Sequence, residues 1–301
     1  MKRAAVLAAT VVAALLAVAG AEAGKPTAYT LPGNAVFPEG VAFEQRTGSF
    51  FATSTTDGTI FRGDIKKPAA AVFLPGGADG RTTAIGLEAD QRGALWVAGG
   101  NTGLIFNYST RSGSLGGKFE TGSGGFLNDV VVTPNGDAFV TDSLRPTLWR
   151  VARGGTTAEA WLDFTGTPIQ YTTGFNLNGI VATEDGRYLI VSQTNKASLF
   201  RIDTRTKQVV QIAGASVAGD GLQLRGRTLW AIAGGAIVKV ALSGDLTRGR
   251  VVSTTTDPSF SSPTTNAIAR GRMLVVNSQF AARNSGTAPT LPFTISSVRI
   301  P

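Results

Sequence analysis

The chain repeats one pattern six times, at intervals of 42 to 50 residues. Each unit contains a short apolar strand, a turn, a second strand, a turn that usually contains glycine, and a third strand. The units start at Gly40, Gly86, Asp129, Gly179, Gly221 and Ala267. A period of roughly 40 to 50 residues is typical of four-stranded propeller blades. The sequence therefore predicts an all-β fold, a six-bladed β-propeller.

The units leave room for a fourth strand at the outer edge of each blade. Residues 158–164 and 207–214 have the apolar pattern expected of such strands. Residues 28–33, near the start of the chain, are predicted to lend a strand that closes the ring. With 38 glycines and 13 prolines, the composition alone is equally consistent with a β-sandwich. The internal repeat is what favours the propeller.

The first 23 residues have the pattern of a secretory signal peptide. Two basic residues precede an apolar run from Ala4 to Ala19, and the triplet at 21–23 has the small residues of a cleavage site. A membrane anchor is the alternative, but a spanning helix needs about 20 strongly apolar residues and this run is shorter and rich in alanine. We predict cleavage near Ala23, secretion to the periplasm or the medium, and a single propeller domain over 24–301 with no membrane span.

The chain contains no cysteine and no histidine, and this excludes much chemistry. Ser-His-Asp triads, Cys-His pairs, imidazole-bound zinc and most redox metal centres need residues that are missing here. Any bound metal should therefore be a hard cation with oxygen ligands. The net charge of +8 is scattered, with no basic run longer than Lys66-Lys67. Nucleic-acid binders cluster their charge, so we expect no nucleic-acid partner and a monomeric protein.

One position in each unit points to a metal site. The first strand of every blade lines the central channel, so the residues just before the unit starts should form a ring around one mouth. They are Glu39, Ile85, Asn128, Asn178, Asp220 and Asn266. Asn and Asp are common in turns, but Glu is not a turn former and the series stays in phase with the repeat. Carboxylate and amide oxygens suit one divalent cation, Ca²⁺ first, with Mg²⁺, Mn²⁺ or Zn²⁺ as alternatives.

Four segments carry a resemblance to a known family: residues 37–43 ("FPEGVAF"), 127–143, 178–203 and 219–234. They resemble the SMP-30/gluconolactonase/LRE family, the regucalcin-like lactonases. The resemblance implies a six-bladed propeller with one divalent cation in its channel.

The family's motifs also imply roles for individual residues. The Glu of its "PEG" element, the Asn of "NG" and the Asp of "DG" hold the metal, which implies Glu39, Asn178 and Asp220 here. The Asn of "ND", here Asn128, would approach both the metal and the substrate. Asp220 would also be the general base that activates water, while the cation polarises the lactone carbonyl.

The sequence departs from the family at the third blade. Sugar lactonases often carry Arg two residues before the Asn of that blade, whereas this chain has Phe126, which argues against a sugar-specific pocket. Residues 165–175 lead to Asn178 and bear Gln170 and Tyr171; a lid and a plain surface loop are both consistent with them. Phe126, Tyr171 and Asn266 are predicted to contact the substrate or support the metal ligands. More loosely, the chain resembles strictosidine-synthase-like and NHL-type propellers.

Two functions remain open. The first is a secreted, divalent-cation-dependent hydrolase of a lactone or a related small ester, favoured by Glu39, Asn178 and Asp220. The second is a non-catalytic propeller that is stabilised by the metal and binds a protein, a glycan or a small molecule; Phe126 favours it. A redox metalloenzyme is disfavoured because the chain lacks His and Cys.

Overall fold

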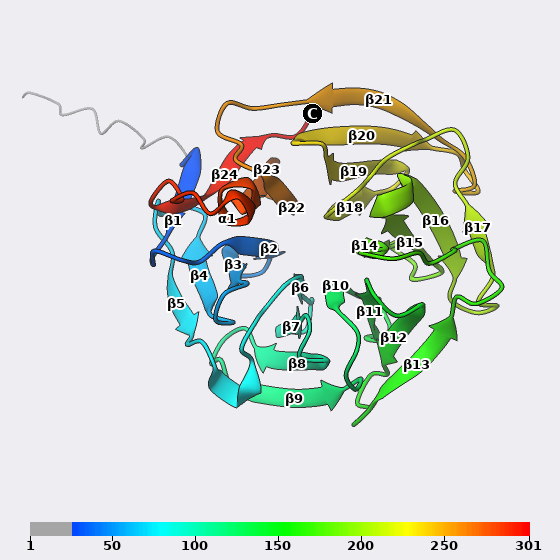
Figure 1. Ribbon diagram of the computed structural model, residues 1–301, viewed down its shortest axis with the longest axis horizontal. Helices are drawn as coiled ribbons and strands as arrows, with labels where there is room; N and C mark the ends of the chain where they lie inside the picture. Colours follow the sequence, from blue (N-terminus) through cyan, green and yellow to red (C-terminus); the bar gives the residue numbers. More distant parts are fainter. Residues whose placement is uncertain (1–25) are drawn as a thin grey trace, which may run out of the picture.

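The computed structural model describes residues 26–301, which form six four-stranded antiparallel sheets around a central channel (Figure 1). The predicted six-bladed β-propeller is confirmed. The predicted signal peptide lies outside the described residues. Over residues 26–301, no helix has both the length and the apolar character needed to cross a bilayer.

The blades follow one another in chain order, and each runs from the channel to the rim. Blade 1 contains β2 (Pro38–Glu44), β3 (Ser49–Ser54), β4 (Ile60–Asp64) and β5 (Ala71–Leu74); blade 2 contains β6 (Leu87–Ala89), β7 (Ala94–Ala98), β8 (Leu104–Ser109) and β9 (Leu115–Glu120). Blade 3 contains β10 (Leu127–Val132), β11 (Ala138–Asp142), β12 (Thr147–Val151) and β13 (Ala158–Asp163).

The second half of the ring has the same order. Blade 4 contains β14 (Leu177–Ala182), β15 (Tyr188–Gln193), β16 (Ser198–Asp203) and β17 (Val209–Gln211); blade 5 contains β18 (Leu222–Arg225), β19 (Thr228–Ala233), β20 (Ala236–Leu242) and β21 (Gly249–Thr255). Blade 6 contains β22 (Pro263–Ala269), β23 (Arg272–Asn277), β24 (Phe293–Arg299) and β1 (Ala28–Leu31). Within residues 26–301, short helices lie in three connections: η1 (Ala78–Gly80), η2 (Thr194–Lys196) and α1 (Phe280–Ser285).

The two ends of the described chain close the ring in blade 6. β1 pairs antiparallel with β24, from Ala28 opposite Ser296 to Leu31 opposite Phe293. The predicted closing strand is therefore confirmed. The outer strands predicted at 158–164 and 207–214 are present as β13 and β17.

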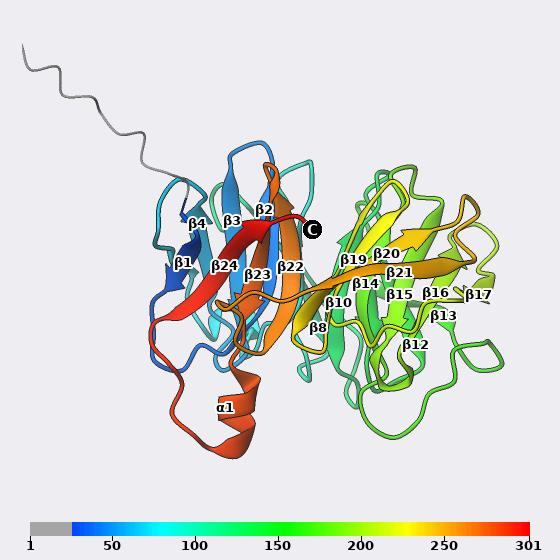
Figure 2. The same ribbon diagram turned by 90° about the horizontal axis from the view of Figure 1, so that it is seen from above.

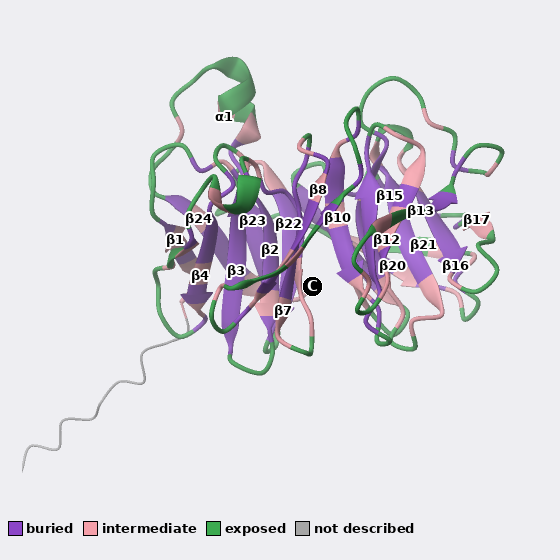
Figure 3. Cartoon of the chain, turned by 90° about the horizontal axis from the view of Figure 1, so that it is seen from below, coloured by how far each residue is buried: buried purple, intermediate pink, exposed green. Residues whose placement is uncertain are grey.

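Apolar side chains hold neighbouring blades together. Each strand alternates its side chains between its two faces, and both faces of a blade pack against a neighbour. One cluster joins blades 1 and 2 through Phe51, Leu95 and Phe106, all fully buried. Figure 3 shows the result: the strands are mostly buried, whereas the connections at both ends of the channel are exposed.

All six inner strands run in the same direction, so their first residues meet at one mouth of the channel. The longest connections lie at this mouth, because they precede an inner strand or join β23 to β24. They are residues 75–86, 164–176 and 278–292, the last of which contains α1. Figure 2 shows α1 projecting beyond the strands on this face. We call this end the ring mouth and the opposite end the far mouth.

Candidate site in the central channel

A β-bulge begins the inner strand of four blades. Between the pairs Pro38–Ser54 and Val41–Ala52, β2 has two residues where β3 has only one. The same mismatch occurs at the start of β10, β14 and β22. A bulge leaves one residue outside the ladder and re-aims its side chain. In β2, β10 and β14 this irregularity contains the predicted ring residues Glu39, Asn128 and Asn178.

Glycine after a ring residue lets the next blade approach closely. A Cβ atom at Gly40 would lie 2.4 Å from the carbonyl oxygen of Ile85, and one at Gly179 would lie 2.1 Å from that of Asp220. No side chain fits at such distances. The Asn-Gly pair at 178–179 therefore reflects contact between blades 4 and 5 and not a turn.

Hydroxyl groups on the second strands bind the same ring of carbonyl groups. Thr53 Oγ1 donates to the Ile85 carbonyl oxygen at 2.7 Å, and Thr141 Oγ1 donates to that of Asn178 at 2.6 Å. Each bond links one blade to the ring residue of the next. The backbone of the ring is thus fixed independently of the side chains that face the channel.

Glu39 is buried in the ring, with 6% of its surface exposed. Thr265 Oγ1 donates to its Oε1 at 3.3 Å, whereas its Oε2 has no hydrogen-bond partner in the described part of the chain. Burial raises the pKa of Glu39 well above its usual value, and the negative charges of Asp220 and Asp129 raise it further. This carboxyl group needs either a proton or a cation.

Asn128, like Glu39, has a buried side-chain oxygen without a hydrogen-bond partner among the residues that the structure describes. It is 5% exposed, and its Nδ2 donates to Ser143 Oγ at 2.9 Å. Ser143 Oγ in turn donates to the Leu177 carbonyl oxygen at 2.6 Å, which fixes the orientation of the amide. The Asn128 Oδ1 atom is buried and finds no partner among residues 26–301. A buried carbonyl oxygen without a partner is costly unless a ligand satisfies it.

Asp220 and Asn178 lie on adjacent blades and interact. Burial raises the pKa of Asp220, hydrogen bonding from the Asn178 side chain lowers it, and the charge of Asp129 raises it, with a net value of about 7. The Asp220 backbone N–H donates to the Ile232 carbonyl oxygen at 2.7 Å, which anchors the residue just before β18. Glu39, Asn178 and Asp220 thus lie near one another, with Asn128 in the same ring, and their role as metal ligands stays a prediction.

Asp129 is a site residue that the sequence analysis missed, since it served there only to mark the start of a unit. It occupies the position at which four other blades have glycine. Its Oδ1 accepts the Val130 N–H at 2.9 Å and its Oδ2 the Ile180 N–H at 3.2 Å. Burial raises its pKa to about 7, although these two bonds oppose the rise. The sequence did contain a signal for it, since Asp129 is an acidic residue at a position of the repeat where glycine is usual.

The channel continues beyond the ring toward the far mouth. A cavity of about 380 Å³ lies there, and its lining includes Asp129, Thr265 and Glu88 of β6. Burial raises the pKa of Glu88 to about 8, and the charges of Asp129 and Asp90 add to this effect. The ring is therefore the upper part of an acidic channel.

Asn266 is not a member of the ring, and its alignment was wrong by two residues. In β22, Pro263 pairs with Asn277 and Asn266 with Val275, which makes Thr264 the equivalent of Glu39. Asn266 is fully buried beside the channel cavity, and its Nδ2 donates to Met273 Sδ at 3.5 Å. The error arose because Asn-Ala imitates the Asn-Gly pattern while the true start, Thr264-Thr265, contains no glycine.

The other two predicted contacts lie above the ring. Phe126 precedes β10 and contacts the ring of Phe175 edge-on, with centroids 4.8 Å apart. Tyr171 donates its hydroxyl to the Asp142 carbonyl oxygen and stacks on Phe164. Tyr171 therefore anchors the 164–176 connection. Gln170 also anchors this connection, since its backbone carbonyl oxygen accepts a hydrogen bond from Gln193 Nε2 at 2.8 Å.

The ring residues fit a cation that is bound by mixed oxygen ligands. Over the described range, acidic side chains do not form a group of three or more that could hold a metal by themselves. Amide oxygens must complete any ligand set. Glu39 Oε2 and Asn128 Oδ1 are buried and available, and Asn178 and Asp220 lie in the same ring. Carboxylate, amide carbonyl and water oxygens are the ligands that Ca²⁺ prefers.

No protein-family model matches the sequence, and no curated protein does. Solved structures are similar. A calcium-binding regucalcin from Agrobacterium tumefaciens has 18% identity and a TM-score of 0.63, over 89% of this chain and 92% of that one. A gluconolactonase from Xanthomonas campestris has 16% identity and a TM-score of 0.62, over 91% and 89%. The chain shares their six-bladed propeller fold.

The fold alone does not decide the activity. The major allergen Mala s 1 of Malassezia sympodialis is also similar, with 12% identity and a TM-score of 0.68, over 91% of this chain and 96% of that one. Propellers host unrelated functions, so the function must be argued from the ring.

Proposed function

We propose that this protein is a divalent-cation-dependent hydrolase of lactones or related small esters. The observation that carries the proposal is the pair of buried oxygens without partners, Glu39 Oε2 and Asn128 Oδ1, beside Asp220 at the channel mouth. The similar regucalcin is described as calcium-binding and another similar protein as a gluconolactonase. Both descriptions support the proposal, with Ca²⁺ as the favoured ion.

Glu39, Asn128, Asn178 and Asp220 would hold the cation. When bound, a divalent cation supplies Lewis acidity, which polarises an ester carbonyl and lowers the pKa of water. Asp220, as a carboxylate, would accept a proton from the attacking water. Ser143 orients the Asn128 amide. The chemistry requires no histidine or cysteine.

A non-catalytic, metal-stabilised binding propeller is the second candidate. The Phe126 and Phe175 pair at the ring mouth supports it, because an apolar rim can bind a ligand without any reaction. In either case the predicted signal peptide supports secretion after cleavage near Ala23. The N-terminal sequence of the exported protein checks that cleavage.

A hydrolysis panel tests the proposal. Purified protein is assayed on lactones and aryl esters with Ca²⁺, Mg²⁺, Mn²⁺, Zn²⁺ or a chelator, beside the variant Asp220→Asn. We expect hydrolysis that needs a divalent cation and is reduced at least about a hundredfold in the variant, the scale of a lost general base. Activity in no condition would support the binding propeller instead, and activity that persists in Asp220→Asn would show that Asp220 is not the general base.

A further inference from the structure

Large apolar side chains are exposed at the ring mouth. Phe175 is 51% exposed and Leu144 is 44% exposed, and both lie in connections that surround this mouth. Phe126 is partly buried and touches Phe175. Exposed apolar side chains that gather next to a polar site often mark a ligand surface.

One serine links these side chains to the ring. The Ser143 N–H donates to the Phe126 carbonyl oxygen at 2.8 Å, and the Ser143 carbonyl oxygen accepts the Asn176 N–H at 2.9 Å. Leu144 follows Ser143 in the chain, and Phe175 precedes Asn176. Ser143 Oγ also accepts the Asn128 amide. The three apolar residues and Asn128, a candidate metal ligand, are therefore all connected through Ser143.

The buried carboxylate of Asp142 also fixes the backbone around Ser143. Asp142 Oδ1 accepts the backbone N–H groups of Phe126 at 2.9 Å and Leu144 at 3.1 Å. Its Oδ2 accepts Arg145 Nε at 2.7 Å and Trp149 Nε1 at 3.2 Å. These bonds fix the backbone of both residues before any ligand arrives. Such preorganisation lowers the entropy cost of binding.

The connection that carries Phe175 is fixed in a similar way. Asn176 Nδ2 donates to the carbonyl oxygens of Thr172 and Gly174, each at 2.8 Å. Asn195 Nδ2 donates to Asn176 Oδ1 at 2.9 Å. Phe175 thus projects from a loop that is hydrogen-bonded to itself and to blade 4. Its backbone is fixed although its side chain is exposed.

We propose that Phe126, Leu144 and Phe175 form a subsite for the apolar substituent of the ester or lactone whose carbonyl binds at the ring. The inference rests on the proposed function and names its substrate class: esters or lactones with an alkyl or aryl substituent. None of the three side chains has a hydrogen-bonding group, so hydroxylated sugar lactones gain nothing from them.

A chain-length series tests the subsite. Wild-type protein is assayed on γ-lactones that carry no substituent or a butyl or octyl chain, and on a hydroxylated δ-lactone. Full burial of one methylene is worth about fourfold in kcat/KM, so we expect a rise of about two- to threefold per methylene on this partly exposed surface. In Phe175→Ser, the ratio of kcat/KM for the octyl lactone to that for the unsubstituted lactone should fall at least about fivefold. The control Leu115→Ser changes a side chain that is 42% exposed on β9, at the outer edge of blade 2, and should keep the wild-type ratio.

The outcomes separate the subsite from the hydrolase. Hydrolysis without chain-length dependence, or a preference for the hydroxylated lactone, overturns the subsite and leaves the hydrolase standing. If no lactone is hydrolysed, the proposed function fails, and binding of alkyl-substituted γ-lactams is measured by calorimetry. Affinity that rises with chain length in the wild type but not in Phe175→Ser supports the subsite. Affinity that is independent of chain length, or absent, overturns it.

Discussion

Glu39, Asp129 and Asp220 bring three carboxyl groups to the ring mouth, and each has a raised pKa. Burial is the largest cause for all three, and a neighbouring carboxylate adds to it for Glu39 and Asp220. Groups of this kind hold their protons to a higher pH than ordinary carboxyl groups when no cation is bound. Binding of a divalent cation should therefore release protons.

Calcium should stabilise the protein more at pH 8 than at pH 5.5. The folded-state pKa of Asp220 is about 7, above its unfolded value of about 3.9, so the stability of the cation-free protein falls as pH rises through that window. At a calcium concentration of 100 times Kd, binding adds about 2.7 kcal/mol, which corresponds to a rise in Tm of about 5 to 10 °C. Thermal unfolding with calcium or chelator at both pH values measures the difference. An equal shift at both would contradict the account.

Asp129→Asn should move the pH dependence of hydrolysis to lower pH. Its negative charge raises the pKa of both Glu39 and Asp220, so its removal lowers the pKa of the proposed general base. The profile of kcat/KM against pH measures this shift. Asp245→Asn, in an exposed turn between β20 and β21, is the control and should leave the profile in place. A pure loss of rate with an unmoved profile would show that Asp129 is only structural.

At the level of elements, the inner strands approach one another through glycine. Gly179→Ala would push a methyl group against the Asp220 carbonyl oxygen, now 2.1 Å from the Cβ position. We expect a loss of about 1 to 3 kcal/mol in stability, as for other overpacked sites, together with weaker calcium binding. Gly244→Ala is the matched control, because a Cβ there meets no atom within 4 Å. Denaturant unfolding and calcium titration of both variants measure these changes. If the two variants have the same stability and calcium affinity, close approach of the blades at Gly179 is not important.

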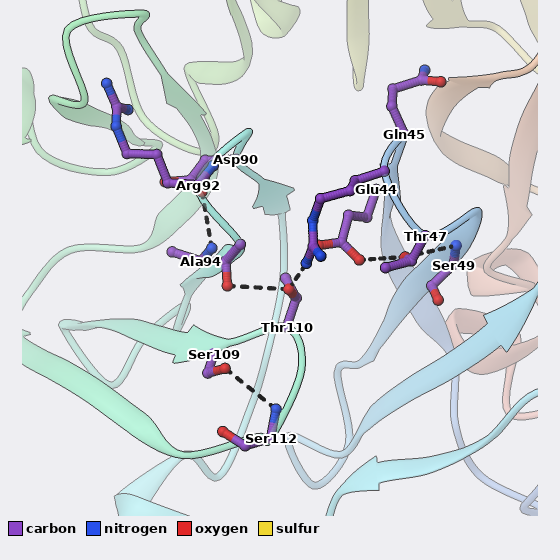
Figure 4. Close-up of polar contacts among 12 residues, drawn as sticks. Glu44, Gln45, Thr47, Ser49, Asp90, Arg92, Ala94, Ser109, Thr110 and Ser112 are labelled. Carbon is purple, nitrogen blue, oxygen red and sulfur yellow. Dashed lines mark hydrogen bonds and ion pairs between the residues drawn. The ribbon is translucent and has the colours of Figure 1, made fainter.

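At the far mouth, polar turns join blade 1 to blade 2 (Figure 4). The Glu44 carboxylate accepts hydrogen bonds from Thr47 and, at 2.8 Å, from Thr110 Oγ1 in the turn between β8 and β9. Burial alone would raise the pKa of Glu44. The hydrogen bonds and the charge of Arg46 outweigh burial, and the net pKa lies below its usual value.

Glu44→Gln should therefore destabilise the protein at neutral pH and much less in acid. A lowered carboxyl pKa contributes stability above the unfolded value of about 4.3, and this contribution is lost as pH falls through the folded value. Loss of about 1 kcal/mol lowers Tm by about 2 to 4 °C at pH 7. Thermal unfolding at pH 7 and pH 3 measures it. The control Glu159→Gln, at a half-exposed ion pair, should change Tm by less than about 1 °C. A loss of the same size at both pH values would point to packing instead.

At the scale of the whole molecule, periodicity predicted the six blades, the closing strand and the outer strands. Glu39, Asn128, Asn178 and Asp220 could be found because each begins a unit in phase with the repeat. Asn266 could not be placed correctly, since only the pairing of β22 with β23 shows where that strand starts. The apolar subsite was also beyond prediction, because it depends on contacts between connections of different blades.

Calcium titration by calorimetry tests most directly whether the ring binds one divalent cation. The wild type should bind one Ca²⁺ per chain, and Glu39→Gln combined with Asp220→Asn should abolish binding. The control, Glu159→Gln combined with Asp245→Asn, removes two carboxylates outside the ring and should bind like the wild type. Calcium binding that is unchanged in the ring variant, or absent from the wild type, would contradict the account.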